Sequence, residues 1–132
     1  MLIMAIDPGV TTGIYYVIDD IPYHNNIAPF DNYLLLHLST YLSKLDLVDK
    51  IIIIEQPPRN GDPEQTKRVN AVEAAIIDIP RLEIVRMLPG EWKPLAKAQK
   101  WTIDIPLGIS MHVQDAYCIY RYYMIKMIKM TK

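Results

Sequence analysis

Two acidic residues each follow a short apolar run of the sequence. Asp7 follows a run of apolar residues, and Glu55 follows four consecutive isoleucines. Runs that are apolar on both faces are typical of strands buried on both sides of a sheet. If these strands are parallel neighbours, their carboxyl ends lie about 4.8 Å apart and the two carboxylates share one small site. We expect a cation between them, and oxygen ligands favour Mg²⁺ or Mn²⁺.

A second polar pair lies in the last quarter of the chain. His112 and Asp115 are three residues apart in an otherwise mainly apolar stretch, so they share one face of a predicted helix. Polar side chains in such a stretch need partners when they are buried. The pair is therefore a candidate to join the two carboxylates in one site.

Each of these residues also has a plain structural explanation. Asp7 begins an Asp-Pro-Gly sequence, which is a turn signal in its own right. Glu55 is close enough in sequence to form an ion pair with Arg59. His112 alone is typical of a structural histidine, and Asp115 alone of a solvated helix residue. Only the combination of the four favours a catalytic site.

The hydrophobic pattern predicts the elements that must position these residues. Strands are expected at residues 2–6, 14–18, 21–27, 51–54 and 83–87, and helices at 32–45, 64–77, 91–100 and 111–130. Asp31 and Ser110 are suitable N-caps, and Asp19-Asp20 is a predicted turn. Pro22 and Pro29 place the third strand at an edge. The order predicts an α/β fold, with three hairpin-linked strands followed by two parallel strands.

Length and composition limit the class of protein. The 132 residues suit one domain, and 51% hydrophobic with 22% charged residues indicates a folded chain. A single cysteine, Cys118, excludes a disulfide framework and a cysteine-rich zinc site, and it suits a reducing compartment. The sequence predicts neither a membrane span nor a signal peptide, because its apolar runs are short and its first residues lack a basic segment.

The net charge of -1 hides an asymmetry. Residues 1–55 contain 2 basic and 7 acidic residues, whereas residues 56–132 contain 12 basic and 8 acidic residues. A strongly basic protein that binds nucleic acid by charge alone is excluded. A local acidic site beside a basic surface remains compatible with these counts.

Taken together, the motifs resemble those of one nuclease family. Residues 4–13 resemble the first strand and turn of RuvC-type Holliday junction resolvases, and residues 51–55 resemble their acid-terminated fourth strand. Residues 112–116 resemble their closing His-x-x-Asp-Ala motif, and residues 88–93 the segment with proline and lysine after their fifth strand. The short chain, and the lack of a clear glycine-rich basic stretch before the last helix, are similar to compact phage and viral relatives.

The resemblance implies a fold, a reaction and an assembly. It implies one RNase H-like nuclease domain over residues 1–132, with a mixed five-stranded sheet flanked by helices. The implied reaction is paired hydrolysis of DNA phosphodiesters at four-way junctions by a homodimer, with two Mg²⁺ ions per active site, or Mn²⁺. Asp7, Glu55 and Asp115 would be metal ligands. His112 would fill the fourth position, either as a metal ligand or as a proton carrier.

Basic residues in the second part of the chain are candidates for contacts with DNA phosphates. The candidates are Arg59, Lys67, Arg68, Lys93, Lys97 and Lys100. The last three are spaced four and three residues apart and so share a helix face. Phosphate contacts position DNA without reading its sequence. For any single one of the six, an ordinary solvated role is the better explanation.

Several alternatives remain open from the sequence. A related RNase H-like nuclease could act on other branched DNA or on structured RNA, and a protein of the same fold could bind nucleic acid without cleaving it. An ATP-binding protein of the actin-like superfamily is disfavoured, because that fold needs two such domains. The helix around residues 69–77 could form the dimer surface or simply the core. The expected location is the cytoplasm, or the host cytoplasm for a viral protein.

Overall fold

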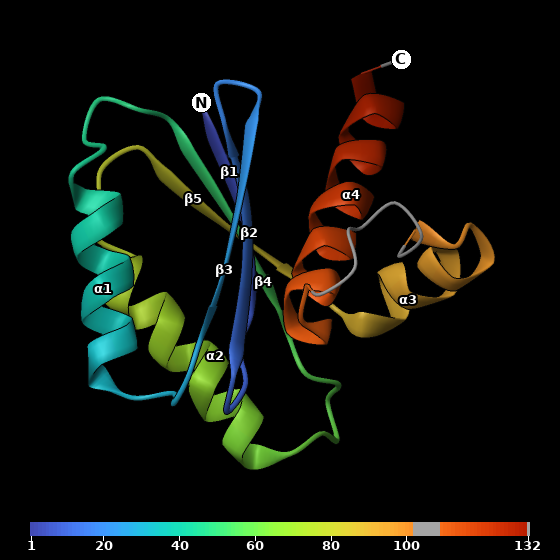
Figure 1. Ribbon diagram of the computed structural model, residues 1–132, viewed down its shortest axis with the longest axis horizontal. Coiled ribbons are helices and arrows are strands. Elements are labelled where there is room, and N and C mark those ends of the chain that lie inside the picture. Colours follow the sequence, from blue (N-terminus) through green and yellow to red (C-terminus); the bar gives the residue numbers. More distant parts are fainter. Residues whose placement is uncertain (102–108, 132) are drawn as a thin grey trace.

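The computed structural model describes residues 1–101 and 109–131, and it contains a five-stranded mixed sheet (Figure 1). The strands are β1 (Leu2–Asp7), β2 (Thr12–Ile18), β3 (Ile21–Ile27), β4 (Lys50–Glu55) and β5 (Leu82–Met87). Their order across the sheet is β3-β2-β1-β4-β5. Strands β1, β4 and β5 are parallel, whereas β2 and β3 join β1 through antiparallel pairs. The predicted fold class is confirmed.

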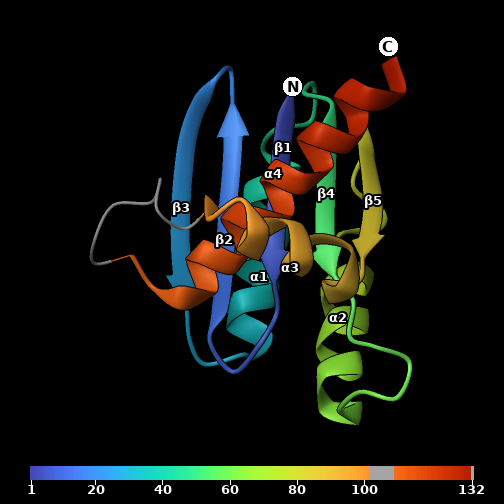
Figure 2. The same cartoon turned by 90° about the vertical axis from the view of Figure 1, so that its right-hand side faces the viewer.

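Helices cover both faces of the sheet. They are α1 (Asn32–Ser43), α2 (Pro63–Ile76), α3 (Pro89–Ala98) and α4 (Met111–Thr131). Figure 1 shows α1 and α2 on one face, and α3 and α4 on the other. Figure 2 shows α4 running obliquely across its face of the sheet. The sheet is therefore the middle layer of three, and β1 and β4 lie at its centre.

A hydrophobic core fills each side of the sheet. On the α1 and α2 side, Val69, Val72 and Ile76 of α2 have 0% exposure and pack against the sheet and α1. The apolar face of α2 is therefore part of the core, as one of the two explanations for residues 69–77 predicted. On the other side, Trp92 and Ile119 belong to a second core cluster under α3 and α4.

The β2–β3 hairpin forms as predicted. Asp19 and Asp20 form its turn with φ angles of 51° and 65°. Two consecutive residues with positive φ give the turn whose twist matches that of the flanking strands. Strand β3 is an edge strand, as Pro22 predicts, because proline removes a backbone donor that a central strand needs.

Caps fix where the helices begin. Oδ1 of Asp31 accepts hydrogen bonds from the first turn of α1, as predicted. The Ser110 hydroxyl accepts from the amide of Val113 at 3.3 Å, which confirms it as the cap of α4. Helix α3 begins and ends two residues earlier than the predicted 91–100. Pro89 occupies its first turn and the Glu91 carboxylate accepts from the backbone at its start, so the helix begins before Glu91.

Among the described residues, no helix is long and apolar enough to cross a membrane.

Candidate active site

Asp7 and Glu55 lie at the carboxyl ends of adjacent parallel strands. Strand β1 pairs with β4 in a register that places Ile6 beside Ile54, so the next residue on each strand is the acid. Asp7 is buried, with 9% exposure, and Glu55 is partly buried. In Figure 1 both strands end at the lower edge of the sheet, beside the start of α4. The expected pairing of these two carboxylates is present.

Gly13 allows α4 to approach this edge of the sheet. Gly13 is the strand partner of Asp7 on β2. A Cβ atom added to Gly13 would lie 2.1 Å from the carbonyl oxygen of His112 and 2.7 Å from the amide nitrogen of Val113. Only glycine therefore permits this contact, which seats the first turn of α4 on the strand next to Asp7. Asp115 lies further along this first part of α4, so the same contact places it beside the two strand carboxylates.

The electrostatics show that the three carboxylates are close to one another. Burial raises the pKa of Asp7 from 3.8 to about 8, and the charges of Glu55 and Asp115 add to the rise. Burial is also the main cause of the raised pKa values of Glu55 and Asp115. His112 is exposed at the start of α4, and its charge lowers the pKa of Asp115. All four predicted site residues thus belong to one neighbourhood.

Two residues of α3 offset this accumulation of negative charge. The indole Nε1 of Trp92 donates a 2.8 Å hydrogen bond to Oε2 of Glu55, which lowers the pKa of that carboxyl. The ammonium of Lys93 lies 5.6 Å from the centre of the Trp92 ring. Its charge lowers the pKa of each of the three carboxyls, Asp7, Glu55 and Asp115. Glu55 thus receives its hydrogen bond from Trp92 rather than from Arg59.

The donor set suits a hard divalent cation. The charges of Glu55 and Asp115 raise the pKa of Asp7, and the charge of Asp115 raises the pKa of Glu55, so a cation between the carboxylates would relieve this repulsion. Among residues 1–101 and 109–131, no three His, Cys, Asp or Glu side chains converge closely enough to hold one ion alone. Mg²⁺ usually binds one or two carboxylates and completes its shell with water and substrate phosphate. The residues fit an ion held in this open way.

The loop after Asp7 is fixed from two sides. The buried Thr12 hydroxyl donates to the carbonyl oxygen of Gly9 at 3.2 Å and closes the Asp-Pro-Gly turn. On the other side, Nε2 of Gln65 on α2 donates to the carbonyl oxygen of Pro8. Asp7 is therefore both a turn residue and a member of the carboxylate cluster, so the structural and functional interpretations are compatible.

A groove of about 600 Å³ leads away from the carboxylates between α3 and α4. Its lining residues are Trp92, Lys93, Ala96, Lys97, Lys100, Asp115 and Cys118. Lys93 and Lys97 of α3 line this groove together with Lys100, and Asp115 connects it to the acidic cluster. Lys100 lies beyond the end of α3 at Ala98, so the prediction that all three lysines share one helix face is wrong for Lys100. Burial raises the pKa of the Cys118 thiol to about 11, so this residue forms a neutral part of the wall.

The other three basic candidates lie outside this groove. Arg59 is exposed on the loop between β4 and α2, and Lys67 forms an exposed 3.2 Å ion pair with Glu64. Arg68 donates to Oε1 of Gln65, the residue that contacts the Asp7 loop. These three residues lie on α2 and on the loop before it, apart from the groove between α3 and α4.

Three contributors to the site were not assigned from the sequence: Gly13 as the seat of α4, Trp92 as the partner of Glu55, and Gln65 as the tether of the Asp7 loop. A glycine at the start of a predicted strand was a usable signal, because such residues mark close backbone approaches. The other two contacts join distant segments, at separations of 37 and 57 residues. No local pattern predicts them.

Comparison with solved structures identifies the fold. RuvC of T. thermophilus, in complex with a Holliday junction substrate, matches with a TM-score of 0.65 and 12% identity, over 96% of this chain and 94% of that chain. This chain has the fold of RuvC. The RNase H-like fold expected from the sequence motifs is therefore confirmed.

Other comparisons are more distant. YeaZ from Pseudomonas aeruginosa matches with a TM-score of 0.52 and 12% identity, over 76% of this chain and 49% of that chain. The fowlpox virus Holliday junction resolvase matches with a TM-score of 0.49 and 12% identity, over 98% of this chain and 99% of that chain. No family model and no curated protein sequence matches the chain.

Proposed function

We propose that the protein is a metal-dependent endonuclease that resolves four-way DNA junctions by paired phosphodiester hydrolysis. The observation that carries this proposal is the meeting of Asp7, Glu55 and Asp115 beside a lysine-lined groove, in a chain with the RuvC fold. RuvC itself was solved with a Holliday junction substrate. The carboxylate cluster supports the metal-dependent chemistry, and the fold shared with RuvC is compatible with it.

The acidic residues supply the ligands of the reaction. Asp7, Glu55 and Asp115 would hold Mg²⁺ or Mn²⁺, two ions per site, through their carboxylate oxygens. Bound divalent ions supply an activated water and neutralise charge on the reacting phosphate. Trp92 orients Glu55 through its indole N–H. His112, exposed beside Asp115, is placed either to bind an ion or to carry a proton at the mouth of the site.

The basic residues hold the DNA. Lys93 is close to all three carboxylates, so its ammonium is placed to contact the scissile phosphate as well as to limit repulsion among the acids. Lys97 and Lys100 extend the positive wall along the groove. Arg59, Lys67 and Arg68 contact phosphates on the α2 side. All of these contacts position DNA without reading its sequence.

Two cuts in a symmetric junction require two sites, so we propose that the working form is a homodimer. Because the apolar face of α2 is core, the dimer must use other surfaces of this helix or another element. Analytical ultracentrifugation with and without junction DNA measures this directly. A chain that stays monomeric when bound to the junction would contradict the dimer.

The substrate class is tested by comparing labelled DNA and RNA. An immobile four-way DNA junction, a three-way junction, a flap, a linear duplex and a structured RNA are incubated with Mg²⁺, Mn²⁺ or EDTA. We expect symmetric paired nicks in the four-way junction, dependent on the metal, and an intact duplex. Equal cutting of all branched substrates would support nuclease activity but contradict a preference for four-way junctions. Binding without cutting under every metal would favour a non-catalytic role.

A further inference from the structure

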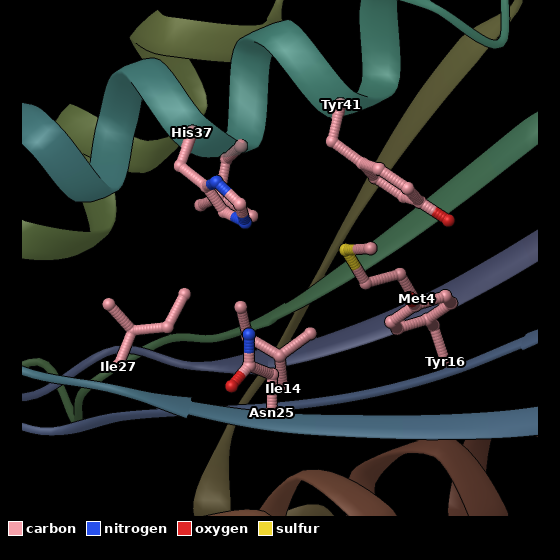
Figure 3. Close-up of a pocket in the computed structure, with 8 residues that line it drawn as sticks. Met4, Ile14, Tyr16, Asn25, Ile27, His37 and Tyr41 are labelled. Atoms are coloured by element: carbon pink, nitrogen blue, oxygen red, sulfur yellow. The ribbon is translucent and has the colours of Figure 1, made fainter.

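Strand packing does not by itself fix the turn that follows Asp7. Met4 of β1 and Ile14 of β2 are buried on the α1 side of the sheet, where they line a small hollow of about 50 Å³ (Figure 3). The turn, residues 8–11, lies beyond the last residue pair of the β1–β2 ladder. Val10, within this turn, is 65% exposed. The position of the Asp7 carboxylate therefore also depends on what holds these four residues.

Two carbonyl groups of the turn accept hydrogen bonds from different directions. The carbonyl of Gly9 accepts from the Thr12 hydroxyl at 3.2 Å, which closes the turn locally. The carbonyl of Pro8 accepts from Nε2 of Gln65, 57 residues further along the chain. Pro8 is buried and has no N–H, so its backbone can only accept. The Thr12 contact fixes the shape of the turn, whereas the Gln65 contact fixes its position relative to α2.

Gln65 is carried by a firmly held helix. It lies in the first turn of α2, where Oδ1 of the N-cap Asp62 accepts from the amide of Glu64 at 3.0 Å. Further along the helix, Val69 and Val72 have 0% exposure and pack in the core. The tether therefore connects the Asp7 turn to an element that is itself anchored at its start and along its length.

Arg68 determines which end of the Gln65 amide faces the turn. It lies three residues after Gln65, on the same side of α2, and its guanidinium donates to Oε1 of Gln65 at 3.1 Å. A guanidinium can only donate, and the Pro8 carbonyl can only accept. The side chain between them must therefore accept on one side and donate on the other. Among residues 1–101 and 109–131, no carboxylate forms an ion pair with Arg68 that would compete with this contact.

Glutamine is the side chain that meets both requirements at this distance. An ionised glutamate would present to the Pro8 carbonyl an oxygen that cannot donate, and a lysine could not accept from Arg68. An asparagine is shorter by one methylene. The chemistry of position 65 is thus set by its two neighbours, Pro8 and Arg68.

We propose that Gln65 is a positioning residue of the nuclease site, which holds the backbone that carries Asp7, and that Arg68 orients Gln65. This inference rests on the proposed function. Gln65 contacts neither metal nor DNA in this role, and it acts only through the turn. Its loss should slow the chemical step and leave the affinity for DNA unchanged.

The first test measures the turn in the full chain, without DNA or metal. Gln65→Met keeps the length of the side chain and loses both polar groups, whereas Gln65→Glu keeps the shape and the acceptor and loses the donor. The ¹⁵N order parameters of Gly9 and Val10 report fast motion of the turn. We expect both variants to shift these two amide signals and to lower their order parameters.

Asn70→Leu is the matched control on the same helix. The Asn70 side-chain oxygen accepts from Arg86 at 3.2 Å, so this variant also removes an amide that is bound to an arginine. The order parameters of the turn should be unchanged in this variant, and so should cleavage.

The second test separates the chemical step from binding. Single-turnover cleavage of the four-way junction is measured at saturating protein with Mg²⁺, and junction affinity is measured in EDTA. A misplacement of about 1 Å can cost about 100-fold in rate, so we expect both Gln65 variants to cleave roughly 10- to 100-fold more slowly. Their affinities should stay within about twofold of that of the native chain. A role in folding alone would change urea unfolding but not the cleavage rate of the folded protein.

Arg68→Met tests the orientation of Gln65 in a double-mutant cycle. It should lower the cleavage rate several-fold in the native chain and have no further effect in Gln65→Met, because its effect on the rate passes through Gln65. A loss of DNA affinity through a phosphate contact of Arg68 would be equal in both backgrounds.

Three results would overturn the proposal. They are an unchanged turn in both Gln65 variants, an unchanged cleavage rate in a variant whose turn is loosened, and an equal loss of rate in Asn70→Leu. An effect of Arg68→Met on the rate that is the same in both backgrounds would contradict its orienting role. A native chain that cuts no substrate would contradict the proposed function, and the order parameters would still decide whether Gln65 holds the turn.

Discussion

The indole nitrogen of Trp92 lies 2.8 Å from a carboxylate oxygen of Glu55, and so ties α3 to the end of β4. This hydrogen bond lowers the pKa of a carboxyl that burial otherwise raises. It favours the charged form of Glu55 and fixes its orientation, and a metal ligand needs both properties.

Replacing Trp92 by phenylalanine should therefore slow cleavage without changing the fold. The ring is kept and the N–H is lost, and a hydrogen bond to a charged group contributes about 1.5–3 kcal/mol. We expect the cleavage rate to fall by roughly 10- to 100-fold, and the acid limb of the pH–rate profile to move to higher pH as the pKa of Glu55 rises.

Trp101→Phe provides the matched control. The Trp101 indole donates to Gln99 at 2.9 Å and does not contact Glu55. Single-turnover cleavage should change little in this variant. Equal losses in both variants, or no loss in Trp92→Phe, would contradict the orienting role of Trp92.

Substitution of Gly13 by alanine should displace the start of α4. The added Cβ would lie 2.1 Å from the His112 carbonyl, so the helix or the strand must move. We expect a destabilisation of about 1–3 kcal/mol, typical of overpacking, and a loss of at least 100-fold in cleavage because Asp115 leaves the cluster. Urea unfolding and cleavage assays measure the two effects.

Gly90→Ala is the control for this prediction, because a Cβ atom there meets no atom within 4 Å. It should preserve both stability and cleavage. If Gly13→Ala folded and cleaved normally, the close contact between β2 and α4 would have no role in positioning Asp115.

The stability of the metal-free protein should fall as the pH rises. The pKa of Asp7 is about 8 in the folded chain and 3.8 ordinarily. Between these values the folded state binds a proton that the unfolded state has lost, so the free energy of unfolding decreases from about pH 4 to pH 8. The loss is at most about 5–6 kcal/mol for this shift.

Urea unfolding in EDTA at pH 5 and pH 8.5 measures the effect. Asp7→Asn should flatten the pH dependence and be more stable than the native chain at pH 8.5, whereas Asp46→Asn, at an exposed aspartate, should behave like the native chain. Mg²⁺ should stabilise the native chain at pH 8.5 but not Asp7→Asn. A native chain equally stable at both pH values would contradict the burial of an ionisable Asp7.

The groove lysines should govern the salt dependence of DNA binding. Each phosphate contact contributes about 0.9 to the slope of log K against log salt for duplex DNA. Lys97→Ala with Lys100→Ala should therefore reduce the slope by about 1.8. Lys44→Ala, at the end of α1 on the opposite face of the sheet, should leave the slope unchanged. An unchanged slope in the double variant would show that the groove lysines do not contact DNA phosphates.

The sequence predicted those parts of the structure that depend on local patterns. The consecutive isoleucines before Glu55 and the apolar run before Asp7 gave two parallel strands, because only central strands are buried on both faces. The caps at Asp31 and Ser110 were also predictable, since capping needs only neighbouring backbone amides.

The long-range contacts were beyond prediction from local patterns. Trp92 reaches Glu55 across 37 residues, and Gln65 reaches Pro8 across 57. The predicted start of α3 was wrong by two residues because Pro89 and the Glu91 side chain together shift the first turn.

The central claim is that Asp7 belongs to a metal-dependent nuclease site. The most direct measurement is cleavage of an immobile four-way junction by the native chain and by Asp7→Asn, with Mg²⁺ or EDTA, at concentrations where both proteins bind the junction. The account predicts paired nicks by the native chain with Mg²⁺ only, and none by Asp7→Asn despite normal binding. Full cleavage by Asp7→Asn, or cleavage by the native chain in EDTA, would contradict it.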